Sequence, residues 1–251
     1  LSQINGIGFR LNGKSILTMP EKTVPQERMD IDLPGYAWDL LPYKAKPLDL
    51  YRAHFWHSNF SHSGRTPFAA IYTSLGCQFG CNFCMINIIN RTDTDERLSA
   101  SDFRTMRFWS PEFVLRQFEI LANYGVESIR ISDEMFFLNR KYYEPIVQGL
   151  VDRGLNLNLW AYARVDTVRP DQLDLFKKAG INWLCLGIEA GNQDVRINIS
   201  KGKFKETNIR NVVDLVGGHN INVLGNYIFG FPNDTFETMQ QTLDLALDLN
   251  T

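Results

Sequence analysis

Several features are scarce or missing in this sequence. It has only 4 cysteines among 251 residues, which is too few for the disulfide framework of a small secreted domain. No stretch of eighteen apolar residues is present, so we expect no membrane span. The formal net charge is -2 at pH 7, and a chain so close to neutral gives no electrostatic reason to expect a nucleic-acid partner. Neither a solenoid repeat nor a low-complexity tract is visible.

The composition that remains is that of a folded domain. Hydrophobic residues make up 44% of the chain and charged residues 22%, which supplies enough apolar material for a full core. The chain begins at Leu1 and stops at Thr251 inside a helical pattern. We therefore expect it to be part of a longer protein.

Residues 1–65 predict a hairpin followed by a linker from an upstream domain. Apolar residues alternate up to Asn12-Gly13, and the chain is extended again after it, which is typical of a β-hairpin with a type I′ turn. Residues 8–15 also match the phosphate-binding pattern G-x4-G-K-[ST]. That loop needs a helix opening at Lys14, whereas the next residues are extended and then broken by proline. The hairpin is the favoured interpretation.

The linker contains the proline-punctuated residues 33–42, which we expect to drape over a surface. The aromatic residues 51–57 predict a short helix. Three histidines near it have irregular spacing and no paired carboxylate, so we assign them to packing or to the linker surface; they are His54, His57 and His62.

Residues 66–251 alternate between strand-like and helix-like segments. Strands are predicted near residues 68–73, 127–132, 156–162, 182–188 and 222–229. Ser110-Pro111 opens the first helix, and a later one ends before Gly217. The last helix is expected to begin with Asp234 as N-cap and to carry one apolar stripe of Phe236, Met239, Leu243 and Leu247. Five strand-helix units predict an α/β fold of parallel strands with right-handed crossovers, curved into a partial barrel.

Three of the cysteines form one compact motif. Cys77, Cys81 and Cys84 have the spacing C-x3-C-x2-C and follow the first predicted strand, so one loop carries all three. Three thiolates on one loop can converge on a single inorganic centre. An iron-sulfur cube held by only three thiolates keeps one iron open for another molecule, and an open iron indicates catalysis rather than electron storage alone.

Two other interpretations of the cysteines compete with the cluster. A structural zinc site needs a fourth thiolate or imidazole, and the remaining cysteine, Cys185, lies in a run that predicts a buried strand. A disulfide framework is disfavoured by the small number of cysteines. We favour an iron-sulfur cluster, and a non-catalytic zinc or electron-transfer domain stays the alternative from another class.

Polar or special residues follow every predicted strand. Catalytic groups gather at the carboxyl ends of parallel strands because the loops converge there. These ends carry Ser132-Asp133-Glu134, Arg164 with Asp166, Gly187-Ile188-Glu189-Ala190-Gly191 and Gly230-Phe231-Pro232. Each set alone is an ordinary cap, turn or surface ion pair. On one rim beside three thiols, together they predict a site.

The cysteine motif resembles that of the radical S-adenosylmethionine (radical SAM) superfamily. The resemblance implies a [4Fe-4S] cluster on the three cysteines, with S-adenosylmethionine (SAM) chelated to the open iron. It also implies reductive cleavage of SAM to methionine and a 5′-deoxyadenosyl radical, and a (β/α)6 partial barrel whose sixth strand would follow Thr251. Phe83, just before the third cysteine, is expected to lie against the adenine.

The resemblance implies roles for the rim residues as well. Ser132, Asp133 and Glu134 stand where the family contacts the amino group of SAM. Lys201 matches a basic position that pairs with the SAM carboxylate, and Arg164 is a second candidate for that carboxylate.

The segment 187–191 is similar to the family's G-x-E-x-G motif. Glu189 is then placed for the ribose hydroxyls, and Gly187 and Gly191 allow close backbone approach. The fifth-strand motif is matched poorly, because Ile228 stands where a small residue is expected.

Within the superfamily, residues 33–42, 72–77 and 187–202 are most similar to the cobalamin-associated group, which includes methyltransferases and an anaerobic tetrapyrrole cyclase. Its D-x-H-x-x-G signature is absent here, so cobalamin would be bound by a domain outside this chain. Methyl transfer and cobalamin-independent cyclisation or rearrangement stay open. The resemblance implies a small-molecule substrate, an external electron donor such as flavodoxin or ferredoxin, and a reducing cytoplasmic location.

Overall fold

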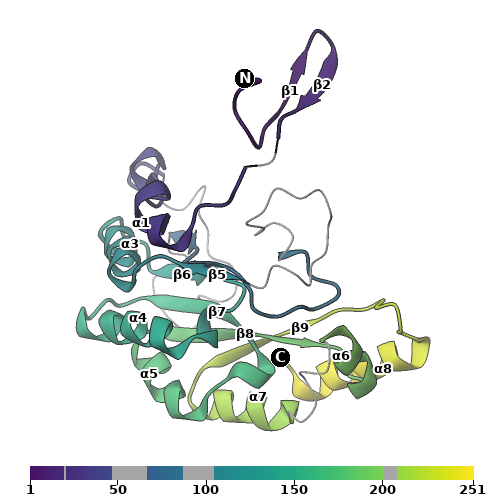
Figure 1. The fold of residues 1–251 in the computed structure, drawn as a ribbon. Coiled ribbons are helices and arrows are strands. Elements are labelled where there is room, and N and C mark those ends of the chain that lie inside the picture. The colour runs from purple at the N-terminus through teal and green to yellow at the C-terminus, as the bar shows by residue number, and fades with distance from the viewer. Residues whose placement is uncertain (20, 47–66, 87–104, 201–207) are drawn as a thin grey trace.

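The computed structural model describes residues 1–19, 21–46, 67–86, 105–200 and 208–251 (Figure 1). The helix expected at residues 51–57, the three histidines near it and Lys201 lie outside these ranges.

The predicted hairpin is confirmed. Strands β1 (Gly8–Leu11) and β2 (Lys14–Leu17) pair antiparallel, and the hairpin projects away from the rest of the chain (Figure 1). Asn12 and Gly13 have φ values of 50° and 78°, as a type I′ turn requires. Because Lys14 begins a strand and not a helix, this segment is not a phosphate-binding loop.

One parallel sheet forms the centre of the fold. Its described strands have the order β3-β6-β7-β8-β9, every neighbouring pair is parallel, and the sheet does not close. The strands are β3 (Phe68–Ile71), β6 (Ser128–Ile131), β7 (Asn158–Arg164), β8 (Ile181–Glu189) and β9 (Asn222–Tyr227). This confirms the predicted α/β partial barrel.

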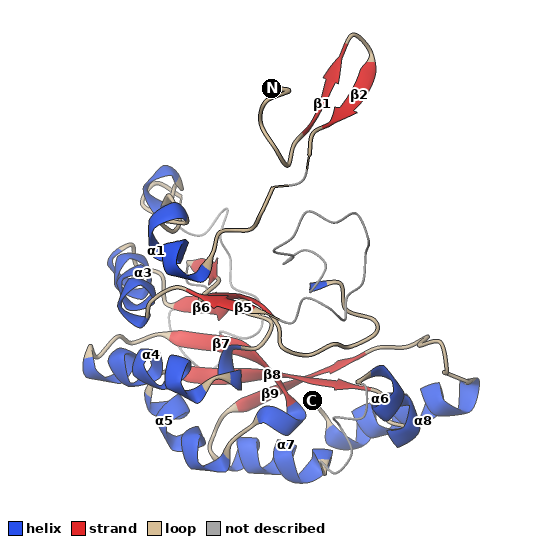
Figure 2. Cartoon of the chain, in the orientation of Figure 1, coloured by secondary structure: helices blue, strands red, loops and turns tan. Residues whose placement is uncertain are grey.

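Helices cover one face of this sheet (Figure 2). The crossover helices there are α3 (Pro111–Asn123), α4 (Arg140–Asp152), α5 (Leu173–Lys178) and α7 (Ile209–Gly218). Two more lie toward the end of β9: α6 (Gln193–Ile199) and α8 (Phe236–Leu249). The smaller elements are α1 (Met29–Asp32), the antiparallel pair β4 (Ser74–Gly76) and β5 (Met106–Phe108), and single turns at Gln26–Arg28, Trp38–Leu40, Phe136–Leu138, Val165–Thr167 and Pro170–Gln172. None of the described helices is long and apolar enough to cross a membrane.

Each strand presents two different faces, because side chains alternate along it. Ile129 and Ile131 of β6 are fully buried in the main hydrophobic core. Residues 128, 130 and 132 therefore point to the opposite face, which is the barrel interior. On β7 the same alternation places Trp160, Tyr162 and Arg164 on the interior side. The interior face is the polar and aromatic one.

The linker packs against the sheet domain. Trp38 Nε1 donates a hydrogen bond of 2.9 Å to Gln117 Oε1 on α3, and the Tyr43 hydroxyl donates one of 3.1 Å to the carbonyl of Phe68. Trp38 and Tyr43 are both part of the main core. The boundary predicted at residue 65 stays a prediction, but the described part of the linker is stabilised by the barrel that follows.

The predicted start of the last helix is wrong by one residue. Thr235 is the N-cap of α8 and forms a capping box with Thr238. Asp234 instead accepts hydrogen bonds of 2.9 Å from the backbone N–H groups of Gly230 and Phe231. The carboxylate therefore closes the turn after β9, which is a common use of Asp ahead of a helix.

The predicted apolar stripe on α8 faces solvent within the described structure, since Phe236 is 82% and Leu247 71% exposed. One helix end differs from the prediction. Helix α7 does not end before Gly217 but runs through Gly218.

Candidate active site

A cavity of about 410 Å³ lies at the carboxyl ends of the strands. Nine of the predicted site residues line it: Cys77, Cys81, Phe83, Cys84, Ser132, Glu134, Arg164, Gly187 and Glu189. Its wall also includes residues that the sequence did not single out for the site: Phe79, Ile86, Met135, Tyr162, Ala163 and Asn226. The structure thus brings together residues from the cysteine loop and from strands β6 to β9.

Asp133 anchors the start of the cysteine loop. Its carboxylate is fully buried and accepts hydrogen bonds of 2.6 Å from both the N–H and the hydroxyl of Thr73, and one of 2.5 Å from the Ser74 hydroxyl. The Tyr142 hydroxyl donates to the Thr73 carbonyl at 2.5 Å. Burial raises the pKa of Asp133 to about 6, while these donors oppose the shift. Asp133 faces the loop lead-in and does not line the cavity.

The loop is held at two further points. The Asn82 backbone N–H donates to the carbonyl of Ile199 at 3.0 Å, and its side chain donates to the carbonyl of Asn198 at 3.2 Å. These carbonyls belong to the last turn of α6, where helical carbonyls lack intrahelical partners. The loop therefore rests on the end of a helix that follows the fourth parallel strand.

Arg164 fixes the loop from the other side. Its guanidinium carbon lies 3.6 Å from the centre of the Phe79 ring, and it forms a bidentate ion pair with Asp166, both hydrogen bonds 2.5 Å long. Arg164 is buried, with 6% of its surface exposed. Burial raises the pKa of the Cys81 thiol, and the positive charge of Arg164 opposes that rise. A fixed positive charge beside a thiol favours its thiolate form, which binds metal.

The donor set fits an iron-sulfur cube. The three thiols line the same cavity. Burial raises the pKa of Cys77 to about 11, and the neighbouring Cys81 and Cys84 contribute to the rise. In the described ranges no three His, Cys, Asp or Glu side chains are grouped so that they could hold a single metal ion. A cube takes one thiolate on each of three irons, so its ligands are spread more widely than those of one ion.

Glu134 supplies a group that fits the amino end of SAM. Its Oε2 atom is buried and has no hydrogen-bond partner among the described residues, although the residue lines the cavity. Burial raises the pKa of Glu134 to about 6, and the charge of Asp133 adds to this. A buried polar atom without a partner is costly unless a ligand satisfies it, and a carboxylate oxygen suits an ammonium donor.

Glu189 is aimed into the cavity by an irregular backbone. The pairing of β8 with β9 shifts register between Gly187 and Glu189, and Glu189 has a φ of 68°. A left-handed backbone at a residue other than glycine costs of order 1–3 kcal/mol and often marks a functional site. Burial raises the pKa of Glu189 to about 7, and the charge of Arg164 opposes the shift. A Cβ on Gly187 would lie 2.6 Å from Glu189 Oε1, so glycine provides the space for this carboxylate.

The other predicted residues have different positions. Phe83 is 42% exposed, and its ring centre lies 5.3 Å from that of Phe231 in the turn after β9. Gly191 does not line the cavity. A Cβ on it would lie 2.3 Å from the carbonyl oxygen of Gln241, so its close backbone approach is to α8.

The residues that sequence reasoning missed fall into two groups. Tyr162 had a usable signal, because it lies two positions before Arg164 on one strand and so shares its face. Thr73, Ser74 and Phe79 had none, since their partners are far away in the sequence. Asn226 becomes visible only from the register of β8 with β9.

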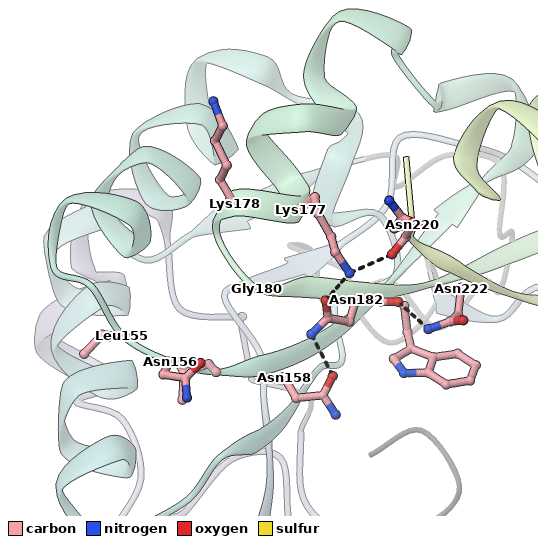
Figure 3. Close-up of a pocket in the computed structure, with 11 residues that line it drawn as sticks. Leu155, Asn156, Asn158, Lys177, Lys178, Gly180, Asn182, Asn220 and Asn222 are labelled. Atoms are coloured by element: carbon pink, nitrogen blue, oxygen red, sulfur yellow. Dashed lines mark hydrogen bonds between the residues drawn. The ribbon is translucent and has the colours of Figure 1, made fainter. Parts of the chain in front are cut away.

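A second cavity of about 470 Å³ lies at the amino ends of β7, β8 and β9 (Figure 3). Several of its asparagine and lysine residues form a hydrogen-bond network. Lys177 Nζ donates to Asn182 Oδ1 at 2.7 Å and to the carbonyl of Asn220 at 2.6 Å, and Asn182 Nδ2 donates to Asn158 Oδ1 at 3.1 Å. The amino ends of barrel strands serve stability rather than catalysis, so we assign this network a structural role.

Residues 71–246 match the radical SAM superfamily. The chain belongs to this superfamily. Membership implies a [4Fe-4S] cluster and SAM as cofactors, and the cysteine loop and cavity described above are where this radical SAM chain would hold them.

Curated relatives of this chain include a methyltransferase and a cyclase. The chain is 29% identical over 252 residues to an uncharacterized methyltransferase of Pyrococcus horikoshii, covering 100% of this chain and 48% of the relative. It is 22% identical over 250 residues to the anaerobic magnesium-protoporphyrin IX monomethyl ester cyclase of Synechocystis sp., covering 97% of this chain and 44% of the relative. The chain thus spans about half the length of these relatives or less.

Solved structures show the same fold. The cobalamin-dependent S-adenosylmethionine radical enzyme OxsB, with aqua-cobalamin bound, matches with a TM-score of 0.66 and 21% identity over 97% of this chain and 32% of that one. The radical S-adenosylmethionine methyltransferase TsrM from Kitasatospora setae, with cobalamin and a [4Fe-4S] cluster bound, matches with a TM-score of 0.62 and 20% identity. The match covers 74% of this chain and 35% of that one. The predicted likeness to the cobalamin-associated group is confirmed.

Proposed function

We propose that this chain is the catalytic domain of an enzyme that cleaves SAM reductively and uses the resulting 5′-deoxyadenosyl radical to functionalise a C–H bond of a small molecule. The observation that carries the proposal is the convergence of three thiols, an unpartnered buried Glu134 oxygen and the strained Glu189 on one cavity. When bound, the cluster supplies the electron and SAM supplies the radical.

In this proposal the residues of this chain bind and orient the cluster and SAM. Cys77, Cys81 and Cys84 would hold the cluster, and Glu134 would accept from the amino group of SAM. Glu189 would accept from the ribose hydroxyls.

Two more positions complete the proposed cofactor site. Phe83 would lie against the adenine, beside Phe231. Arg164 is already engaged by Asp166 and Phe79, which favours a role in holding the loop. This leaves Lys201, outside the described residues, as the preferred candidate for the SAM carboxylate.

For the finer reaction, methyl transfer with cobalamin held outside this chain is the first candidate. It is supported by the relatives and structural neighbours that are named methyltransferases. Cobalamin-independent cyclisation or rearrangement is the second candidate, because a cyclase is also among the relatives. We expect a small-molecule substrate and an external electron donor such as flavodoxin or ferredoxin for either reaction.

The proposed function is tested by anaerobic reconstitution of the full-length protein. Electron paramagnetic resonance of the reduced cluster should show a signal that shifts when SAM is added, because SAM would bind the open iron. Dithionite and SAM should then yield 5′-deoxyadenosine. Zinc instead of iron, or a cluster indifferent to SAM, would refute the proposal in favour of a structural or electron-carrying domain. Transfer of a labelled methyl group only in the presence of cobalamin would select the first reaction.

Replacing Glu189 with alanine should weaken SAM binding by about 10- to 100-fold, because hydrogen bonds to a charged group contribute about 1.5–3 kcal/mol. Iron content should stay at the wild-type level, since Glu189 is not a cluster ligand. Isothermal titration of SAM into the reconstituted protein measures the affinity. Glu144→Ala on the exposed face of α4 is the matched control. Unchanged affinity in Glu189→Ala would remove Glu189 from the SAM site.

A further inference from the structure

Arg130 lies on the barrel interior, one layer below the candidate active site. It is paired in register with Trp160 of the next strand. Its guanidinium carbon lies 5.4 Å from the centre of the Trp160 ring, and its Nε donates a hydrogen bond of 2.9 Å to Ser132 Oγ. The Trp160 ring in turn lies 5.3 Å from the ring of Tyr162. A cation thus sits beside two aromatic rings inside the barrel.

The charge of Arg130 has no carboxylate partner in the part of the chain that the structure describes. The described groups that interact with it, Ser132, Trp160, Tyr162 and Cys185, are neutral. Burial raises the pKa values of Tyr162 and Cys185, and the positive charge of Arg130 opposes both shifts. By contrast, Arg164 on the same interior face is paired with Asp166. A partly buried arginine without a carboxylate partner destabilises the folded state, unless a bound anion neutralises its charge.

Arg130 is one hydrogen bond away from the wall of the cavity above it. Ser132, which accepts from Arg130, and Tyr162, which stacks on Trp160, both line the cavity that the cysteines line. Binding sites for small molecules commonly combine apolar and aromatic walls with one well-placed charge. The flat face of Tyr162, which lines the cavity, suits a planar apolar body, and the planar guanidinium of Arg130 suits a carboxylate.

We propose that Arg130 binds a carboxylate of the substrate, and that the planar apolar part of the same molecule lies against Tyr162 in the cavity, below the SAM site. This inference rests on the proposed function and specifies its substrate class. A carboxylate is favoured over a phosphate because one monoanion neutralises one arginine, whereas a phosphate dianion would carry surplus charge into a neutral layer.

Three probes with one ring system test the inference: 2-naphthoate, the neutral 2-naphthamide and 2-naphthyl phosphate. They are titrated into the full-length reconstituted protein with saturating SAM and without reductant, so that SAM occupies its own site and is not consumed. Wild-type protein should bind 2-naphthoate at least about tenfold more tightly than 2-naphthamide, given the usual strength of a charged hydrogen bond. Arg130→Gln should remove that preference.

Control variants separate recognition from folding. Arg116→Gln removes an arginine that also lies over an aromatic ring, that of Phe113, but on α3; it should keep the full preference. Arg130→Lys keeps the positive charge but loses the planar guanidinium, so it should keep part of the preference for 2-naphthoate over 2-naphthamide. Affinity for SAM should be unchanged in Arg130→Gln, and its collapse would place Arg130 in the cofactor site and overturn the inference.

The wild-type titration decides the matter even if a variant fails to fold. Equal affinity for 2-naphthoate and 2-naphthamide, or tighter binding of 2-naphthyl phosphate, would overturn the carboxylate assignment. So would an undiminished preference in Arg130→Gln. Formation of 5′-deoxyadenosine is measured separately. If 5′-deoxyadenosine forms but the carboxylate preference is absent, only this inference fails. If 5′-deoxyadenosine does not form, the proposed function itself fails.

Discussion

Replacing Cys81 with alanine should abolish the iron-sulfur centre and, with it, formation of 5′-deoxyadenosine. Cys81 is the middle of three thiols on one cavity wall, and a cube left with two protein thiolates lacks a ligand on a second iron. Iron and sulfide analysis after anaerobic reconstitution, together with the visible absorbance of the cluster, measures the loss. Both should fall to background.

Cys185→Ala provides the matched control. Cys185 is the remaining cysteine of the chain; it is 1% exposed on β8 and is not among the residues that line the cavity. Its replacement should leave the iron content unchanged and lower stability only by the small amount expected for a buried methyl-sized deletion, about 1 kcal/mol. A complete [4Fe-4S] signal in Cys81→Ala would contradict the ligand assignment, as would loss of iron in Cys185→Ala.

The fold was predictable because two short-range signals agree along the chain. Apolar runs of strand length alternate with helices whose starts and stops are marked, as at Ser110-Pro111. Parallel strands with helical crossovers then have few alternatives. The errors arise where neighbouring residues compete for one position. Asp234 and Thr235 both suit an N-cap, and only the hydrogen bonds of the structure show which one takes it.

The site was predictable as a set but not in its internal assignments. The sequence places Asp133 and Glu134 after the same strand, and either carboxylate could face the cofactor. The structure turns Asp133 toward Thr73, 60 residues earlier in the chain, and leaves Glu134 at the cavity. Such a choice depends on contacts between distant segments, which no local pattern encodes.

The backbone at Glu189 shows the same limit. A G-x-E-x-G pattern indicates a turn, yet the positive φ of Glu189 and the register shift before it arise from the pairing of β8 with β9. Bulges of this kind re-aim a side chain at the edge of a sheet. The pattern therefore predicts which residue is used, while the sheet determines where its carboxylate points.

Replacing Asp133 with alanine should destabilise the protein by about 3–4 kcal/mol, because three buried donors on Thr73 and Ser74 lose their acceptor. The loop lead-in would then be free to move, so we also expect reduced iron content after reconstitution. Asp133→Asn should have a smaller effect, since the two hydroxyls can rotate to accept hydrogen bonds from the amide. Denaturant unfolding under anaerobic conditions measures the stability, and iron analysis measures the cluster.

Asp133→Asn also separates the two roles open to this residue. If Asp133 holds the cysteine loop, stability and iron content fall together, and SAM affinity per reconstituted cluster stays close to wild type. If Asp133 contacts the amino group of SAM, as the sequence pattern first indicates, SAM affinity falls while stability and iron content do not. Asp174→Asn, an 84% exposed carboxylate, should change none of the three. The buried hydrogen bonds to Thr73 and Ser74 favour the first outcome, because a carboxylate that already accepts three donors has little capacity left for a ligand.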